Sequence, residues 1–422
     1  MDSNQFEIEM IELYHEAANV FLPFTPITLV ELFQGRKSEV QAVTNALELP
    51  GRHVVLYGDR GVGKTSLANL TSFFANWCDD EIFTYSCSKA DKFETIFDSV
   101  CSRFGQEFIE HERKCETQSG VEVFNAKASK AKTSVTRNVV KYTVDANSVF
   151  SVLEEKDVLI VLDEFDRIED EDSKLAISEL AKKLSDCASK SKLLIVGVSG
   201  TISDLIGHHP SAVRCFEQVK MERMTNSEIG EILVTGFDRL GISVPGLLLD
   251  QCTNMADGFP HFAHLIGLKL AQSCIERCRK SRTRQLTVNP EVDYLDAIDK
   301  CVDGASQSLR DAYTHATESR ARKTDRYKRI LEAVAVSEKI DVSVREILNY
   351  LTKTSGEEVA HQQINTHLGR LVNEAQLGVL ERARTGVYKF RDPMLRAFVK
   401  MKIAERKLRD PEKYYQMKFK FV

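Results

Sequence analysis

The sequence lacks the features that mark secreted proteins or membrane proteins. Its first residues, MDSNQFEIEM, are acidic and contain no basic stretch followed by an apolar one, so no secretory signal is expected. No apolar run approaches about 18 residues, the length needed to span a membrane as a helix. We therefore expect a cytoplasmic protein without a membrane partner.

Metal-binding and effector-type motifs are also missing. The ten cysteines include no C-x-x-C pair. Cys274 and Cys278 are four residues apart, on one face of an expected helix, and no second pair has metal-ligand spacing. We expect reduced thiols rather than a zinc site or disulfides. No nuclease, TIR or protease motif is apparent, nor an acceptor-substrate motif of a metabolic kinase.

The chain has 422 residues, 43% of them hydrophobic and 28% charged, a balance typical of soluble globular proteins. Domains of about 100–200 residues predict two or three domains. Four short apolar runs alternate with segments of helical periodicity such as 173–186, which predicts an α/β fold with a doubly wound parallel sheet. These runs are HVVLYG (53–58), EIFTYSC (81–87), DVLIVLDEF (157–165) and KLLIVGVS (192–199).

Changes in pattern divide the chain into three expected domains. Residues 1–222 form the α/β base, interrupted at about 107–145 by a polar insertion rich in Ser, Thr and Lys. Residues 223–319 have helical periodicity, with Thr225 or Asn226 as the first N-cap, and are expected to form a helical lid.

Residues 320–422 differ in both pattern and charge. Three helix-like segments (325–336, 343–352 and 357–373) precede a hairpin pattern around Thr385-Gly386, which predicts a winged helix-turn-helix domain with a basic C-terminal tail. This part holds 23 Lys and Arg against 13 Asp and Glu, which leaves 34 against 49 for residues 1–319. A basic domain on an acidic body is an asymmetry that attracts nucleic acid.

The most specific motif is GDRGVGKT (58–65), a full match to G-x-x-x-x-G-K-[ST] between an apolar strand and a helix. Glycines let backbone N–H groups turn toward phosphates, and the following helix N-terminus adds partial positive charge. ATP with Mg²⁺ is the expected ligand. Lys64 would reach the β- and γ-phosphates, and the Thr65 hydroxyl would bind Mg²⁺. The other expected cofactor-binding residues of this stretch are Gly58, Asp59, Arg60, Gly61, Val62, Gly63 and Ser66.

A second element follows the strand VLIVLDEF (158–165). It delivers Asp163 to the carboxyl end of the sheet, where ligands of open α/β sheets bind. Asp163 would hold Mg²⁺, directly or through water, and Glu164 would polarise the attacking water as general base. The acidic residues after them, among them Asp166 and Glu169, are expected to form a solvated turn.

The run KLLIVGVSGT (192–201) ends in two hydroxyl side chains, Ser199 and Thr201. Either could hydrogen-bond the attacking water or the γ-phosphate. Equally, they could serve as loop or helix-capping hydroxyls.

In their order, these motifs resemble those of AAA+ ATPases, in the branch around the origin-recognition initiators and the related STAND signalling NTPases. The resemblance covers roughly residues 25–410. It implies a P-loop NTPase parallel sheet of AAA+ type, followed by a helical lid and a winged-helix domain. The segments that carry it are ELFQGRKSEV (31–40), GDRGVGKTS (58–66), VLIVLDEFD (158–166), VGVSGT (196–201), HHPSAVRCF (208–216) and GFPHFAHLIG (258–267).

The resemblance also assigns roles outside the phosphate loop. Gly35 and Arg36 would belong to the N-terminal box near the adenine, and Ser199 to the sensor-1 position. Arg214 lies where these families carry an arginine finger, which completes the site of a neighbouring subunit in trans and implies a homo-oligomer. The alternative for Arg214 is an ordinary surface cation.

In the lid, Pro260 would open the sensor-2 helix, in which many AAA+ proteins place an arginine. Here the corresponding turn has His261 and His264 instead. His261 could contact phosphate weakly, but we expect packing of the lid on the base.

The C-terminal domain has two interpretations. Its expected recognition helix, 357–375, has an apolar face of Ile364, Leu368 and Leu371. Its polar positions, His361, Gln362, Asn365 and Arg370, suit base edges or phosphate, and the wing cations Arg382, Arg384 and Lys389 suit backbone phosphate. Winged helices in this branch also serve in protein interaction or packing, and the helix at 400–410 could dock on the ATPase core.

Three functions follow. The leading one is an ATP-hydrolysing molecular switch that oligomerises with nucleotide and acts on or with DNA. The second is a signalling or defence NTPase that gates a separate effector protein. The third is a non-catalytic ATP-binding scaffold.

Overall fold

The computed structural model describes residues 3–75, 77–104, 144–199, 205, 213–318, 325–355 and 361–410. All but the last two residues of the insertion expected at 107–145 lie outside these ranges. The chain divides into two compact units. The sheet unit is Lys37–Gly58 with Lys64–Met221, and the helical unit is Met1–Arg36 with Asp59–Gly63 and Glu222–Val422. No helix in the described part is long and apolar enough to cross a membrane.

The sheet unit is built on a five-stranded parallel sheet in the order β2-β3-β4-β1-β5. Four strands are the apolar runs that the sequence predicts. The fifth, β5, was not predicted because its six residues, FEQVKM, alternate between buried and more exposed positions at the sheet edge. The strands are β1 (His53–Gly58), β2 (Ile82–Ser86), β3 (Leu159–Asp163), β4 (Lys192–Val198) and β5 (Phe216–Met221).

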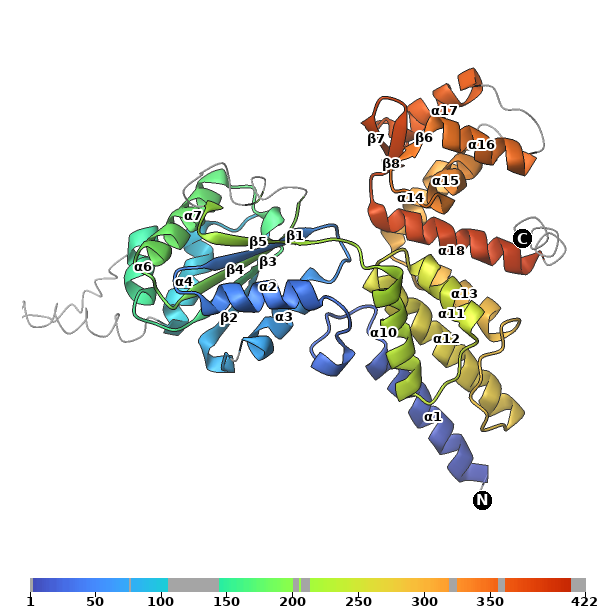
Figure 1. Ribbon diagram of the computed structural model, residues 1–422, viewed down its shortest axis with the longest axis horizontal. Helices are drawn as coiled ribbons and strands as arrows, with labels where there is room; N and C mark the ends of the chain where they lie inside the picture. The colour runs from blue at the N-terminus through green and yellow to red at the C-terminus, as the bar shows by residue number, and fades with distance from the viewer. Residues whose placement is uncertain are drawn as a thin grey trace, which may run out of the picture. The chain divides into compact units, whose positions relative to one another are not determined.

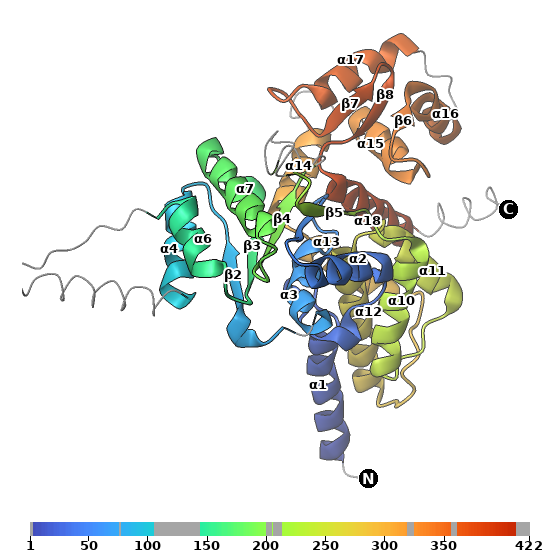
Figure 2. The ribbon, with the colours of Figure 1, turned by 60° about the vertical axis from the view of Figure 1, so that its left-hand side comes forward.

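Helices cover both faces of this sheet (Figures 1 and 2). On one face lie α2 (Lys37–Glu48) and α3 (Lys64–Phe74), and on the other α4 (Phe93–Phe104), α6 (Ala146–Leu153) and α7 (Glu171–Asp186). Between α4, α6, α7 and the sheet lies a core of fully buried side chains, among them Phe97, Ile160 and Phe165. Short 3-10 turns η2 (Asp79–Glu81) and η3 (Phe165–Arg167) follow α3 and β3.

A buried histidine joins two of these layers. His53 opens β1 and is completely buried. Its Nδ1 accepts a hydrogen bond from the Leu193 amide of β4 (3.1 Å), and its Nε2 lies 2.9 Å from the Ala181 carbonyl of α7. An acceptor at Nδ1 and a donor at Nε2 define the neutral imidazole. Burial lowers the pKa of His53 from 6.5 to about 4.

This histidine predicts an acid-sensitive sheet unit. Between pH 6.5 and about 4 the unfolded chain binds a proton at His53 that the folded chain does not. Stability therefore falls as pH falls through this window, by about 1.4 kcal/mol per pH unit from this group. Urea unfolding at several pH values should show a shallower pH slope for His53→Gln than for the wild type. Equal slopes would assign the acid sensitivity to other groups.

The helical unit contains four helices from the expected lid region, α10 (Asn226–Arg239), α11 (Gly246–Ala256), α12 (Pro260–Ser281) and α13 (Asp293–Gly304). Thr225 caps α10 through a capping box with Glu228, as the sequence predicts. The N-terminal helix α1 (Ser3–Val20) packs on α12, and η1 (Val30–Leu32) follows it. The fully buried Phe21 lies against Gly236 of α10 and Gly267 of α12, where no side chain larger than glycine would fit.

The remainder of the helical unit combines helices with a small antiparallel sheet of order β6-β8-β7. Thr385-Gly386 makes the turn between β7 and β8, and the expected apolar face of α17 is buried at Ile364, Leu368 and Leu371. The elements are α14 (Gln307–Thr317), α15 (Arg326–Val336), β6 (Val342–Ser343), α16 (Val344–Ser355), α17 (His361–Val372), β7 (Leu380–Arg384), β8 (Val387–Phe390) and α18 (Pro393–Arg409).

Candidate functional site

The stretch from Gly58 to Thr65 joins β1 to α3 through a turn that only glycine allows at several points. Gly58, Gly61 and Gly63 have φ angles of +148°, +79° and +96°. These lie in the left-handed half of backbone space, which favours glycine. A Cβ atom on Gly58 would also collide with the Met221 carbonyl oxygen of β5. The glycines of the motif are therefore required by backbone geometry.

Lys64 is the first residue of α3 and is 8% exposed. Its Nζ donates a hydrogen bond to the Gly58 carbonyl oxygen at 3.1 Å, within the sheet unit. This contact folds the lysine back over its own loop, at the carboxyl end of β1 and the N-terminus of a helix. Thr65 follows it and is half-buried. An ammonium group beside a helix N-terminus and a glycine-rich turn fits the phosphates of a nucleotide.

The tip of the loop, Asp59–Gly63, belongs to the helical unit, where Arg36 holds it. Arg36 is 4% exposed. Its guanidinium donates to the carbonyl oxygens of Val62 (3.1 Å) and Glu222, and its backbone N–H donates to Glu228 Oε1 (3.1 Å). We predicted Arg36 from the N-terminal box, and in the structure it contacts the loop backbone.

Gly35 and Pro260 lie beside the same loop and its anchor. Gly35 has a φ of +71°, and a Cβ atom there would lie 2.7 Å from Met224 Cε. Pro260 occupies the first turn of α12, and its Cγ lies 3.6 Å from the position of a Cβ on Gly63. Pro260 thus lies next to Gly63 of the loop, and Gly35 lies next to Glu228, which binds the Arg36 backbone.

The acidic pair lies at the carboxyl end of β3, in the sheet unit. Asp163 is the last residue of this strand, and its Oδ1 accepts a hydrogen bond from the Glu164 backbone N–H at 2.8 Å. Glu164 has a φ of +54°, a left-handed conformation that costs a non-glycine residue about 1–3 kcal/mol. Strained backbone conformations of this kind are common at active sites and ligand-binding sites.

Two side chains fix the Glu164 carboxylate. Ser86 Oγ donates to Oε2 at 3.2 Å, and the Arg167 guanidinium lies 2.9 Å from the same oxygen. Ser86 ends β2 and pairs in register with Asp163. Ser86 was not predicted from the sequence. The available signal was its position at the end of an expected strand.

The other acidic residues after β3 have structural partners. Asp166 Oδ1 accepts from the Val198 backbone N–H at 2.7 Å and so ties η3 to the end of β4. Asp170 caps α7 by accepting from the Ser173 backbone N–H. Glu169 forms an exposed ion pair with Lys89. Ser199 directly follows β4 and is half-buried, whereas Thr201 lies outside the described residues.

Arg214 is exposed and lies just before β5. The register pairs His53 with Phe216, so Arg214 is at the amino edge of the sheet. Gly58, Asp163 and Glu164 are at the opposite, carboxyl edge. Within one chain, the structure does not bring Arg214 to the acidic pair.

His261 and His264 of α12 contact the backbone of the N-terminal segment rather than each other. His261 Nδ1 lies 2.6 Å from the Pro23 carbonyl oxygen, and burial lowers the pKa of its imidazole. His264 Nδ1 accepts from the Leu22 backbone N–H at 3.3 Å, and burial lowers the pKa of His264 to about 4. Burial thus disfavours the charged form of both imidazoles, which favours packing over phosphate binding.

The residues fit a nucleotide with a divalent cation. Among the described residues, no three His, Cys, Asp or Glu side chains gather to form a metal site of their own. Mg²⁺ in nucleotide sites needs only one or two protein ligands besides phosphates and waters. Thr65 and Asp163 are suited to supply them. None of the nine cysteines within the described ranges forms a disulfide.

Comparison with known proteins agrees with this geometry. Residues 32–196 match the family model of the AAA ATPase domain. This stretch includes the phosphate loop and the acidic pair, and the match supports nucleotide binding. No curated protein matches the chain.

The chain is also similar to solved structures of low sequence identity. The chain is similar to the Walker-type ATPase Paby2304 of Pyrococcus abyssi, with 18% identity and a TM-score of 0.50, covering 90% of this chain and 99% of that one. Cdc6p from Pyrobaculum aerophilum has 15% identity and a TM-score of 0.43, covering 92% and 98%. The ORC1 protein of Aeropyrum pernix, solved in complex with DNA, has 17% identity and a TM-score of 0.42, covering 90% and 95%. The family model and the Paby2304 structure confirm the predicted P-loop fold of AAA+ type.

Proposed function

We propose that this chain is a Mg²⁺-dependent ATPase that works as a nucleotide-driven switch, assembles into a homo-oligomer with ATP and acts on DNA. One observation supports the ATPase most directly. Gly58 and the buried Lys64 of the phosphate loop lie at the carboxyl edge of the same parallel sheet as the Asp163–Glu164 pair. This edge is where open α/β sheets bind ligands.

Each residue has a distinct task in this proposal. The loop from Gly58 to Thr65 cradles the phosphates with backbone N–H groups, and Lys64 contacts the β- and γ-phosphates. Thr65 and Asp163 hold Mg²⁺, which when bound neutralises the charge that develops on the phosphates. Glu164 accepts the proton of the attacking water.

The position of Arg214 supports the proposed oligomer. It is exposed at the amino edge of the sheet, opposite the acidic pair of its own chain. Such an arginine is available to the site of a neighbouring copy, where it would stabilise the charge of the transition state. Ser199, next to the end of β4, is proposed to orient the attacking water.

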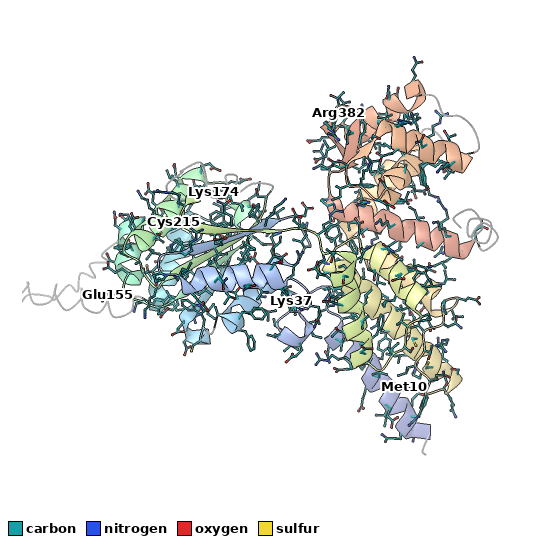
Figure 3. The ribbon with its side chains drawn as sticks, viewed as in Figure 1. Met10, Lys37, Glu155, Lys174, Cys215 and Arg382 are labelled. Atoms are coloured by element: carbon teal, nitrogen blue, oxygen red, sulfur yellow. The ribbon has the colours of Figure 1, made fainter. Side chains whose placement is uncertain are left out.

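The C-terminal part, proposed to be a winged helix, is the proposed DNA contact. Residues 320–422 carry the excess of basic residues, and Gln362, Asn365 and Arg370 of α17 are exposed. On the β7–β8 hairpin, Arg382 (labelled in Figure 3) and Arg384 are exposed. The Arg382 guanidinium lies over the Tyr388 ring, 5.8 Å from its centre. Lys389 forms an ion pair with Glu381 at 2.9 Å and is the weaker candidate for phosphate.

Sizing and turnover test the proposal together. The protein is sized with ADP, with a slowly hydrolysed ATP analogue, and with the analogue plus duplex DNA, and ATP turnover is measured with and without DNA. We expect the analogue to produce a larger species than ADP and DNA to bind that species. Absence of turnover in protein that binds ATP would refute the ATPase. A nucleotide-dependent oligomer without DNA binding would favour control of a protein partner.

The hairpin arginines give a sharper test of DNA contact. The double substitution Arg382→Ala with Arg384→Ala should weaken binding to all duplex sequences about equally, because phosphate contacts carry no sequence information. It should also reduce the slope of log affinity against log salt by about 2 for two lost contacts. Fluorescence anisotropy at several salt concentrations measures both. Arg239→Ala, an exposed arginine at the end of α10, is the control. An unchanged slope in the double variant would exclude the hairpin as a DNA contact.

A further inference from the structure

One buried carboxylate in the helical unit is shared by three cations. Asp257 follows α11 in a left-handed conformation (φ +55°), and its side chain is 7% exposed. Its Oδ2 lies 2.9 Å from the Arg223 guanidinium. Its Oδ1 lies 3.3 Å from the Arg396 guanidinium and 2.5 Å from Lys400 Nζ. The last two cations both belong to α18.

Arg223 connects this cluster to the phosphate loop. Its Nε lies 3.7 Å from Asp59 Oδ2, at the loop tip, while its Nη1 contacts Asp257. The guanidinium stacks over the Phe259 ring, 4.8 Å from its centre, and the side chain is 13% exposed. Its Nε makes no hydrogen bond and is fully covered. Arg223 is thus held between Asp257 and the phosphate loop without a complete set of partners.

The first turn of α18 also touches the loop. Met394 is the second residue of this helix, and its Sδ lies 3.0 Å from the position of a Cβ on Gly61. Two loop positions therefore lie next to this network: Asp59 lies near Arg223, and Gly61 lies near Met394 of α18. Within the helical unit, α18 and the tip of the phosphate loop, Asp59–Gly63, belong to one continuous network of contacts.

Charge in this network is unbalanced, since Arg223, Arg396 and Lys400 share a single buried carboxylate. Burial lowers the pKa of Lys400, and Asp257 opposes this shift. Arg396 has further partners in the Ala335 and Ser337 carbonyl oxygens, and Lys400 has the Asn254 carbonyl oxygen at 3.1 Å. Charges interact strongly in a cluster that is shielded from water. If one cation is removed, the negative charge of Asp257 therefore neutralises the remaining cations more completely.

We propose that Asp257 is a relay through which α18 sets the phosphate affinity of the nucleotide loop. Arg223 is the positioning residue of this relay, and Lys400 with Arg396 determines how far Asp257 neutralises Arg223. When α18 is docked, its cations occupy Asp257, and the positive charge of Arg223 acts on the loop. When α18 leaves, Asp257 neutralises Arg223, and the loop loses affinity for anions.

The relay deepens the proposed ATPase switch and rests on its ATP-binding loop. Through the relay, a partner that binds the C-terminal domain and displaces α18 would change the affinity of the loop for nucleotide. Coupling between two sites is reciprocal, so ATP binding must in turn change the docking of α18.

A lysine series on α18 tests the relay in the full-length protein. Lys400→Gln should weaken ATP binding at least about fivefold, the lower range of measured site–site couplings. Lys400→Arg keeps the charge and should restore affinity. Lys402→Gln is the matched control, because Lys402 forms its ion pair with Glu405 on the same helix. Calorimetry measures the affinities. Asp257→Asn should change affinity in the opposite sense to Lys400→Gln, and if it fails to fold the lysine series decides alone.

Hydrogen–deuterium exchange without nucleotide separates the relay from the ATPase proposal. Lys400→Gln should change amide exchange in residues 58–65, whereas Lys402→Gln should leave it as in the wild type. Changed exchange in a protein that does not bind ATP would retain the relay and refute the ATPase. Wild-type ATP affinity and wild-type exchange in Lys400→Gln would overturn the relay, even if the variant melts at a lower temperature.

Discussion

Lys64→Ala is expected to weaken ATP binding by at least about 100-fold, a loss of about 2.7 kcal/mol. Lys64 is 8% exposed and its Nζ lies 3.1 Å from the Gly58 carbonyl oxygen. This position keeps a positive charge at the helix N-terminus where the phosphates are proposed to bind. Alanine removes the charge and leaves the glycine turn in place. The phosphate loop would then depend on backbone N–H groups alone.

Ligand-induced stabilisation measures this loss. With ATP at 100 times its dissociation constant, the wild type gains about 2.7 kcal/mol of stability, which appears as a raised melting temperature. Lys64→Ala should gain almost none at the same ATP concentration. Alanine is the best helix former, so α3 should still begin at this position.

Lys37→Ala serves as the control for this prediction. Lys37 is likewise the first residue of a helix in the sheet unit, α2, but it is exposed (Figure 3). Its removal should leave the ATP-induced shift as in the wild type. If Lys64→Ala bound ATP as well as Lys37→Ala, the phosphate site would lie elsewhere, and the proposed function would fail with it.

Local sequence signals predict most of the sheet unit. The strands β1, β3 and β4 are nearly continuous Val, Ile and Leu, because both of their faces are covered by helices. The edge strand β5 escaped the same reasoning because its Glu217 and Lys220 give it a mixed pattern. The other edge strand, β2, was predicted because its Ile, Phe and Tyr residues form an apolar run, so β5 was missed because of its charged residues rather than its edge position alone.

The contacts around the site were harder to predict, since they join distant parts of the chain. Arg36 and Val62 are 26 residues apart, and Ser86 and Glu164 are 78 apart. A motif indicates which residue types a site needs. It does not indicate which backbone carbonyl an arginine will reach, or which serine will hold a glutamate.

The association of residues 1–36 with the helical unit shows the same limit. In sequence they precede the sheet, so they were expected within the domain 1–222. In the structure, Phe21 fills the space that Gly236 and Gly267 leave between two helices more than 200 residues away. The fit of a large side chain against two distant glycines leaves no periodic pattern in the sequence from which it could be predicted.

Glu164→Gln is expected to reduce ATP turnover by about 100- to 10,000-fold without weakening ATP binding, the range for loss of a general base. Glutamine keeps the shape of glutamate and retains an oxygen that accepts a hydrogen bond from Ser86. It has no carboxylate to take a proton from water. The left-handed backbone of Glu164 should persist, because it is set by the turn into η3 rather than by the charge.

The measurement is steady-state phosphate release at saturating ATP, together with ATP affinity by calorimetry. Glu169→Gln is the control, since Glu169 follows the same strand but forms an exposed ion pair with Lys89. Its turnover should match that of the wild type. Comparable turnover in Glu164→Gln would place the base elsewhere, and a glutamine variant with full biological activity would favour the non-catalytic scaffold.

The same variant separates nucleotide binding from hydrolysis in the proposed switch. Because Glu164→Gln binds ATP but hydrolyses it very slowly, the ATP-bound state should persist, and the oligomer should form with ATP as it does with a slowly hydrolysed analogue.

Arg214→Ala should weaken that oligomer or its residual turnover only if Arg214 completes the site of a neighbouring copy. A mixture of Arg214→Ala and Glu164→Gln chains decides between the two roles. In an equimolar random mixture, about a quarter of the interfaces would combine an intact Glu164 with an intact Arg214 from the neighbouring chain, and partial recovery of turnover requires a site shared between subunits.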